Sequence, residues 1–184
     1  MVEANDSSME YIMSRAELAS PDTDWEVSWR RARLKGMGYI ATSLLWKLLH
    51  RWLPTEQRLA RILPNTSESC KYCPTPTPAD LEHSFFGCVK TRDVGNSLLT
   101  ALRHHDPSIT PAGPLRLEFQ EQGDKEMPLV WVTAHTLQYM WSMRTSGRVV
   151  DLFLTRSMLE NKITLLRETR YENEASLIDE ILMI

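Results

Sequence analysis

Cys70-Lys71-Tyr72-Cys73, followed by His83 and Cys88, is the stretch on which the interpretation of this sequence depends. It reads C-x₂-C-x₉-H-x₄-C and uses all three cysteines of the 184-residue chain. Tetrahedral zinc takes four thiolate or imidazole ligands, and two ligand pairs at short spacing supply them. The alternative is three reduced core cysteines beside a surface histidine, but chance rarely places every cysteine in this order. The pattern therefore predicts one Zn²⁺ ion held by Cys70, Cys73, His83 and Cys88.

This predicted zinc site is of the structural kind. A catalytic zinc keeps one coordination position open for water, whereas four protein ligands leave no vacancy. The flanking sequence is rich in Ser, Thr and Pro and poor in apolar residues, so we expect metal binding to contribute to folding. The H-x₄-C pair is expected on a helix, with its two ligands about one turn apart on one face.

The charge distribution is more informative than the formal net charge of −3. Residues 1–24 carry six acidic groups and one basic group, and we expect this acidic segment to be disordered. Residues 25–63 carry eight basic and two acidic groups, a local charge of +6. A basic segment next to a zinc site is typical of proteins that bind nucleic acids.

Several properties of the chain bear on its location in the cell. Thiolate ligands require a reducing compartment. The chain has no signal-peptide pattern and no apolar run long enough to span a membrane. We therefore expect a nuclear or cytoplasmic protein that is neither secreted nor bound to a membrane.

The hydrophobic periodicity predicts an all-α fold, a helical bundle with a CCHC zinc knuckle inserted between helices. We expect three parts after the acidic segment: a helical zinc-binding domain over 25–105, a loop or linker over 106–127, and a helical region over 128–184 that packs on the first domain. The linker is expected because 106–127 holds four turn-forming segments. A helix is expected to start at Trp25, and further helices cover about residues 39–52, 55–63, 80–88, 91–105, 128–146, 148–169 and 176–184. We expect Thr55 and Asp80 to be N-caps. The helix over 55–63 should bury Leu59, Ile62 and Leu63, and the apolar residues of 91–105 recur at a spacing of three to four: Val94, Leu98, Leu99 and Leu102.

Longer sequence motifs surround the four predicted metal ligands. A tryptophan-containing helix ends in Leu48-Leu49-His50, Leu53-Pro54-Thr55 follows with Leu59 four residues later, and Asp80-Leu81-Glu82-His83-Ser84-Phe85-Phe86-Gly87-Cys88 completes the metal motif. In this order, residues 25–102 resemble the zinc-binding region that follows the polymerase in reverse transcriptases of non-LTR (LINE-type) retrotransposons. Trp141-x-x-Arg144 resembles the tail of such proteins.

The resemblance implies a helical, zinc-stabilised C-terminal part of an element-encoded polyprotein. In that family this part is thought to assist in binding the element's RNA or the target DNA. Carried over by position, the metal ligands are the same four residues that the spacing predicts.

Our first functional hypothesis is therefore a non-catalytic module that binds RNA or single-stranded DNA. Cations neutralise phosphates, and the candidate contacts combine the basic segment with the tip of the knuckle. They are Arg30, Arg31, Arg33, Lys35, Arg51, Arg58, Arg61, Lys71 and Tyr72. The alternative is that these cations form only the solvated face of two helices. The tryptophans of the same segment are expected in the core rather than in stacking contacts.

Two other functions remain open. A protein-interaction or scaffold module would use helix 148–169 and the apolar C-terminus Ile181-Leu182-Met183-Ile184 to pair with a partner or with itself. An enzyme is disfavoured, because the sequence holds no Gly-rich phosphate loop, no nucleophile elbow and no aspartate pair of a polymerase. His104, His105 and His135 are isolated, and we expect no small-molecule substrate.

Overall fold

The computed structural model describes residues 23–120, 123, 126–169 and 171–182, and within these ranges it contains helices and no strand. The predicted all-helical class is thus confirmed for this part of the chain, whereas the acidic segment expected over 1–24 lies almost wholly outside it. The helices are α2 (Trp25–Arg31), α3 (Tyr39–Leu49), α4 (Glu56–Ala60), the π-helical η1 (His83–Gly87), α5 (Arg92–His105), α6 (Ala112–Arg116), α7 (Glu126–Thr145), α8 (Leu152–Arg167) and α9 (Glu172–Leu182).

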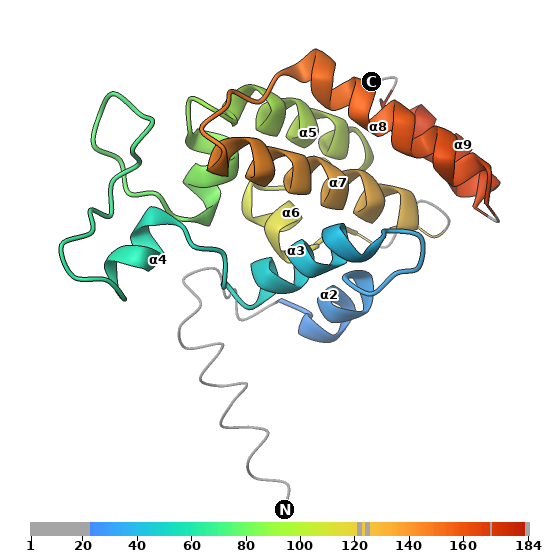
Figure 1. The fold of residues 1–184 in the computed structure, drawn as a ribbon. Helices are drawn as coiled ribbons and strands as arrows, with labels where there is room; N and C mark the ends of the chain where they lie inside the picture. The colour runs from blue at the N-terminus through green and yellow to red at the C-terminus, as the bar shows by residue number, and fades with distance from the viewer. Residues whose placement is uncertain (1–22, 121–122, 124–125, 170, 183–184) are drawn as a thin grey trace, which may run out of the picture.

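Helix α7 lies at the centre of the fold, with α3, α5, α8 and α9 packed around it (Figure 1). Every residue from Leu129 to Leu137 is buried, including Trp131, which is 1% exposed. The sequence explains this position, since a helix that is apolar on all sides can only be stable when it is surrounded by other elements. Among the described residues, no helix combines the length and the hydropathy that crossing a bilayer would require.

The segment 106–127, expected as a loop or linker, is part of the core in its described portion. It contains α6, and Leu115, Leu117 and Phe119 are buried. The Asp106 carboxylate holds the segment closed, because it accepts hydrogen bonds from the backbone N–H of Ser108 (3.1 Å) and of Gln120 (3.0 Å). One hydrophobic cluster extends from Ala32 to Ile181 across this segment. The turn-forming residues here shape a short buried element instead of a linker.

Helix α8 begins later than the predicted 148–169, because Asp151 caps it by accepting the backbone N–H of Leu154 at 2.9 Å. Its buried face consists of Thr155, Leu159, Ile163 and Leu166. Helix α4 is also shorter than the predicted 55–63. Its N-cap is Thr55, as expected, but Ile62 and Leu63 beyond its end are exposed rather than buried.

Candidate metal centre and basic surface

The four predicted ligands lie together. The donor atoms of Cys70, Cys73, His83 and Cys88 are all within 4.8 Å of one another. The Cys70 and Cys88 sulfurs are 3.6 Å apart, and the Cys73 sulfur is 3.5 Å from His83 Nε2. Regular tetrahedral zinc separates two sulfurs by about 3.8 Å and a sulfur from a nitrogen by about 3.6 Å, from the usual bond lengths. These three thiols and one imidazole could therefore bind one metal ion.

The first ligand pair sits on a short loop closed by backbone pairing. Ser69 and Pro78 form an isolated antiparallel bridge. Across it, Cys70 N–H donates to the Thr77 carbonyl at 2.8 Å and Ala79 N–H to the Glu68 carbonyl at 2.9 Å. The loop between Ser69 and Pro78 reverses the direction of the chain after Cys73. The prolines at its tip have no backbone N–H, so they leave no donor without an acceptor.

The second pair depends on η1. Asp80 begins the helical turn as predicted, accepting the His83 N–H at 2.7 Å. Residues five apart on an α-helix lie about 140° apart around the axis, so His83 and Cys88 would face different sides. The wider π turn corrects this, with Cys88 N–H donating to the His83 carbonyl at 2.7 Å. Gly87 leaves room for the imidazole, since a Cβ there would lie 3.0 Å from His83 Nδ1.

The two buried cysteines differ in acidity. Burial opposes ionisation of Cys70, but the backbone N–H groups of Tyr72 and Cys73 and the imidazole of His83 donate to its sulfur and bring the pKa to about 6. Burial and the neighbouring Cys70 sulfur raise the pKa of Cys88 to about 11. Ionisation is therefore easier at Cys70 than at Cys88. A cation between the two sulfurs would favour a second thiolate beside the first.

Arg144, from the last turn of α7, connects this site to the core. It is 3% exposed, its Nη2 pairs with a Glu56 oxygen at 2.8 Å, and the same nitrogen is 3.6 Å from the Cys70 sulfur. The Tyr72 hydroxyl donates to the Arg144 carbonyl at 2.8 Å. Burial disfavours the charged form of Arg144, but Glu56 raises its pKa above the ordinary value. Its positive charge offsets the excess that three thiolates would place on a divalent ion.

Sequence analysis did not assign Arg144 or Glu56 to the metal centre. The only sequence feature that marked Arg144 was the Trp141-x-x-Arg144 phrase, which carried no role. The contact between Arg144 and Cys70 spans 74 positions of the chain, so neither spacing nor periodicity reveals it.

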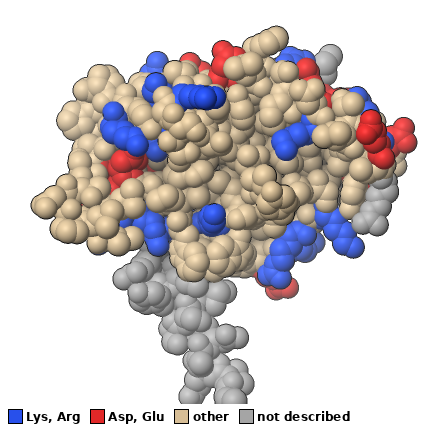
Figure 2. Space-filling view, in the orientation of Figure 1, with Lys and Arg blue, Asp and Glu red and all other residues tan. Residues whose placement is uncertain are grey.

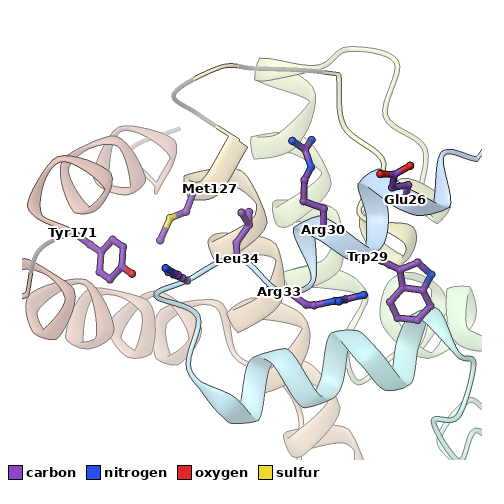
Figure 3. Close-up of a pocket in the computed structure, with 8 residues that line it drawn as sticks. Glu26, Trp29, Arg30, Arg33, Leu34, Met127 and Tyr171 are labelled. Carbon is purple, nitrogen blue, oxygen red and sulfur yellow. The ribbon is translucent and has the colours of Figure 1, made fainter.

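The predicted nucleic-acid contacts form separate groups. Arg30, Arg33 and Lys35 are exposed and line one open pocket of about 840 Å³ (Figure 3). In Figure 2, Lys and Arg atoms gather at the lower edge of the molecule, where α2 lies in Figure 1. The pocket is completed by Glu26, Trp29, Leu34, Met127 and Tyr171.

Arg31 does not belong with these cations. It is 2% exposed, its Nε pairs with Glu126 at 2.9 Å, and its Nη1 donates to the Leu117 carbonyl at 2.8 Å. The charge pattern suggested a surface residue, but this guanidinium anchors α2 to the start of α7 and to the end of α6. We therefore remove Arg31 from the candidate contacts.

The other candidates lie beyond the end of α3. Arg58 is half-buried and donates to the Arg51 carbonyl at 2.6 Å, Arg51 is itself half-buried, and Arg61 is exposed. In the knuckle, the Lys71 ammonium lies 5.0 Å from the centre of the Tyr72 ring. Tyr72 is half-buried against Arg144, so it has a structural contact whatever else it binds. In Figure 1, α3 separates α4 and the knuckle from α2.

The tryptophans of the basic segment are not all in the core, contrary to expectation. Trp25 and Trp29 are partly buried against the core, but Trp46 is 42% and Trp52 is 55% exposed. Trp46 follows the buried Leu44 and Leu45 on α3 and therefore falls on the outer side of the helix.

Comparison of the whole chain with known protein families, with characterised proteins and with solved structures finds no match.

Proposed function

We propose that this chain is a zinc-stabilised, non-catalytic module that binds RNA or single-stranded DNA. The ion is one structural Zn²⁺ on Cys70, Cys73, His83 and Cys88. In this proposal the module has the role of the region that follows the polymerase in non-LTR retrotransposon reverse transcriptases, which residues 25–102 resemble.

The donor set supports zinc over other common metals. Three thiols and one imidazole are soft and intermediate ligands, which favour zinc over magnesium or calcium. Four donors at tetrahedral separations suit an ion that has no open position. The proposal is tested by elemental analysis of protein purified without added metal, for which we expect about one zinc per chain.

The observation that carries the nucleic-acid proposal is that Arg30, Arg33 and Lys35 all line one open pocket, together with the aromatic side chains of Trp29 and Tyr171. Arg30 pairs with Glu126 at 3.2 Å, but its side chain is 56% exposed. No ion pair of Arg33 or Lys35 is found among the described residues. When exposed cations of this kind bind phosphates, the nucleic acid releases its condensed counterions. The binding affinity therefore falls as the salt concentration rises.

The test is the salt dependence of binding to a 5′-labelled single-stranded RNA, measured with the zinc-loaded chain. The variant R33A/K35A removes two cations from the pocket. For single strands, each lost phosphate contact should lower the slope of log K against log salt by about 0.7. We therefore expect weaker binding and a shallower slope.

The matched control is R92A/R156A, which removes two cations from α5 and α8. Both arginines have about the same exposure as Arg30, at 57% and 55% of the side chain. The control should bind RNA like the original protein. If both double variants lose the same affinity, bulk charge and not the pocket is responsible. If the original protein binds no nucleic acid at low salt, the proposed function is wrong.

A second function, protein interaction, is favoured by the apolar surface around the start of α8. Val149 before the helix and Leu152, Phe153 and Leu154 in its first turn are exposed, Phe153 by 77%. Of the C-terminal residues expected to join this surface, Ile181 is buried at 1% and is not available, and residues 183–184 lie outside the described part. Light scattering distinguishes the candidates: a concentration-dependent dimer that F153S abolishes would favour this function.

A further inference from the structure

Four aromatic rings meet where α3 ends. His50 lies at the centre, with ring-centre distances of 4.7 Å to Trp29, 4.2 Å to Trp46 and 5.4 Å to Trp52. Trp46 and Trp52 meet edge to face, 5.0 Å apart at 89°. Burial lowers the pKa of His50, so this ring is neutral near pH 7 and packs as an aromatic group. We call these four residues the ring cluster.

The backbone turns sharply to build this cluster. Helix α3 ends with Arg51 in the left-handed region at φ 53°. Arg51 N–H donates to the Leu48 carbonyl at 2.8 Å, and Trp52 N–H donates to the Lys47 carbonyl at 2.7 Å. This is a Schellman ending, which normally uses glycine because other residues are strained there. It turns the Trp52 ring back against Trp46.

Core packing does not account for this arrangement. The turn brings together Trp46 and Trp52, which are both substantially exposed, while Leu48, Leu49 and Leu53 beside them fill the core. Large aromatic side chains that stay open to solvent in a strained turn are typical of binding surfaces.

The ring cluster is continuous with the basic pocket. Trp29 belongs to both, since it lines the pocket and contacts His50. Figure 3 shows the Arg33 side chain extending toward Trp29. Lys47, next to Trp46 on α3, is exposed as well. The cations of the pocket and the rings of the cluster thus lie next to each other, and Trp29 belongs to both groups.

We infer that the ring cluster stacks the unpaired bases of a single nucleic-acid strand, while Arg33 and Lys35 bind its phosphates. This inference rests on the proposed function and specifies its ligand. Stacking requires exposed base faces, which a duplex hides and a single strand offers. Cations beside a group of exposed rings suit a strand that offers both phosphates and unpaired bases. An apolar protein segment carries no phosphates for Arg33 and Lys35 to bind, so it fits this surface less well than a nucleic-acid strand does.

The experiment measures binding of the zinc-loaded chain to a labelled 12-nucleotide oligouridylate. A second oligonucleotide of equal length has abasic sites in place of its central bases, and a third is fully paired. The variants are W46A, W52A and, as control, F153A, which removes an exposed aromatic ring from α8. The abasic comparison uses the unaltered protein, so it does not depend on how the variants fold.

We expect each tryptophan substitution and the abasic strand to weaken binding about fivefold or more, with F153A unchanged. The salt slope should stay the same in W46A and W52A, because stacking releases no counterions. Equal affinity for the intact, abasic and duplex ligands, with normal salt dependence, would overturn the stacking inference and leave the proposed function standing. Absence of binding to any oligonucleotide would overturn both.

Discussion

The helical core and the metal-binding region are held together by different forces. In α7, every residue from Leu129 to Leu137 is buried. Between Glu56 and Pro78, by contrast, Cys70 is the only buried residue among 23 consecutive described positions. The core therefore has enough apolar burial to fold, whereas α4 and the loop that follows it do not.

This difference explains how the two regions are joined. Among the described residues, the buried members of the second hydrophobic cluster are Cys70, Ala79 and Cys88, with Tyr72 and Cys73 packed against them. Arg144 joins Cys70 to α7, and η1 joins the main core through the buried Phe85 and Phe86. An ion bound by the four clustered donors, together with the Arg144–Glu56 pair, would stabilise this loop where apolar contacts are few. The two regions should accordingly respond differently to chelation, substitution and acid.

The largest effect should come from removing the metal. A chelator, Cys73→Ser or His83→Ala should each destabilise the zinc-loaded protein by roughly 5 kcal/mol or more, because binding energy is folding energy for such a loop. That corresponds to a fall in Tm of about 10 °C or more for a chain of this size. Differential scanning calorimetry with and without chelator provides the measurement.

Hydrogen exchange then shows whether chelation affects the metal loop and the helical core differently. The Cys70 and Ala79 amides, which close the metal loop, should lose protection on chelation, and amides in the middle of α7 should keep it. His104→Ala, on an exposed histidine of α5, is the control and should change neither quantity. A chelated protein with the same Tm and the same protection would contradict a structural metal.

The next largest effect should come from Arg144. Arg144→Met leaves the Glu56 carboxylate, whose side chain is 13% exposed, without its partner, and breaking a buried pair costs about 3–5 kcal/mol. The double variant Glu56→Gln/Arg144→Met should recover part of this loss, as measured by urea unfolding in a double-mutant cycle. Arg148→Met, on an exposed arginine nearby, should be neutral. Additive losses in the cycle would show that the pair is not coupled.

The sequence predicted those features that depend on neighbours along the chain. The helical class, the Asp80 and Thr55 caps, and the gathering of the four metal ligands all follow from spacings of a few residues. The buried face of α5, with Val94, Leu98 and Leu102, follows from the spacing of its apolar residues, which recur every three to four positions.

Features that depend on distant contacts were not predictable in this way. Arg31 was taken for a surface cation because its partner Glu126 is 95 positions away. The π turn at η1 replaces a regular helix, and no spacing rule for α-helices predicts it. The exposure of Trp46 and Trp52 contradicts the usual behaviour of tryptophan. The helical position of Trp46 explains its exposure, but no periodicity marks Trp52, which follows the turn at Arg51.

A smaller effect should arise where α5 meets η1. A Cβ at Gly95 would lie 2.5 Å from the Phe85 carbonyl oxygen, which is backbone and cannot move aside cheaply. Gly95→Ala should therefore destabilise the protein by about 1–3 kcal/mol, although alanine is the better helix former. Asn96→Ala, at the next and exposed position, should be neutral or slightly stabilising in the same thermal melt. A stabilising Gly95→Ala would mean that the two helices are not in close contact.

The last effect is a pH dependence of the core, about 2 kcal/mol between pH 7 and 5. His135 is 5% exposed, and burial, with a contribution from Lys162, lowers its pKa from 6.5 to about 3. The folded protein keeps it neutral in mild acid, whereas the unfolded chain binds a proton below about pH 6.5. Stability should therefore be highest above that pH and fall by about 1.4 kcal/mol per unit as the pH drops toward 3.

The metal ligands also take up protons in acid, so the His135 contribution must be measured as a difference. His135→Leu keeps the apolar volume and removes the titration, while His104→Leu changes an exposed histidine only. Between pH 7 and 5, urea unfolding of His135→Leu should show about 2 kcal/mol less loss than the original protein, and His104→Leu should show the full loss. Equal losses in all three would mean that the folded core does not lower the pKa of His135.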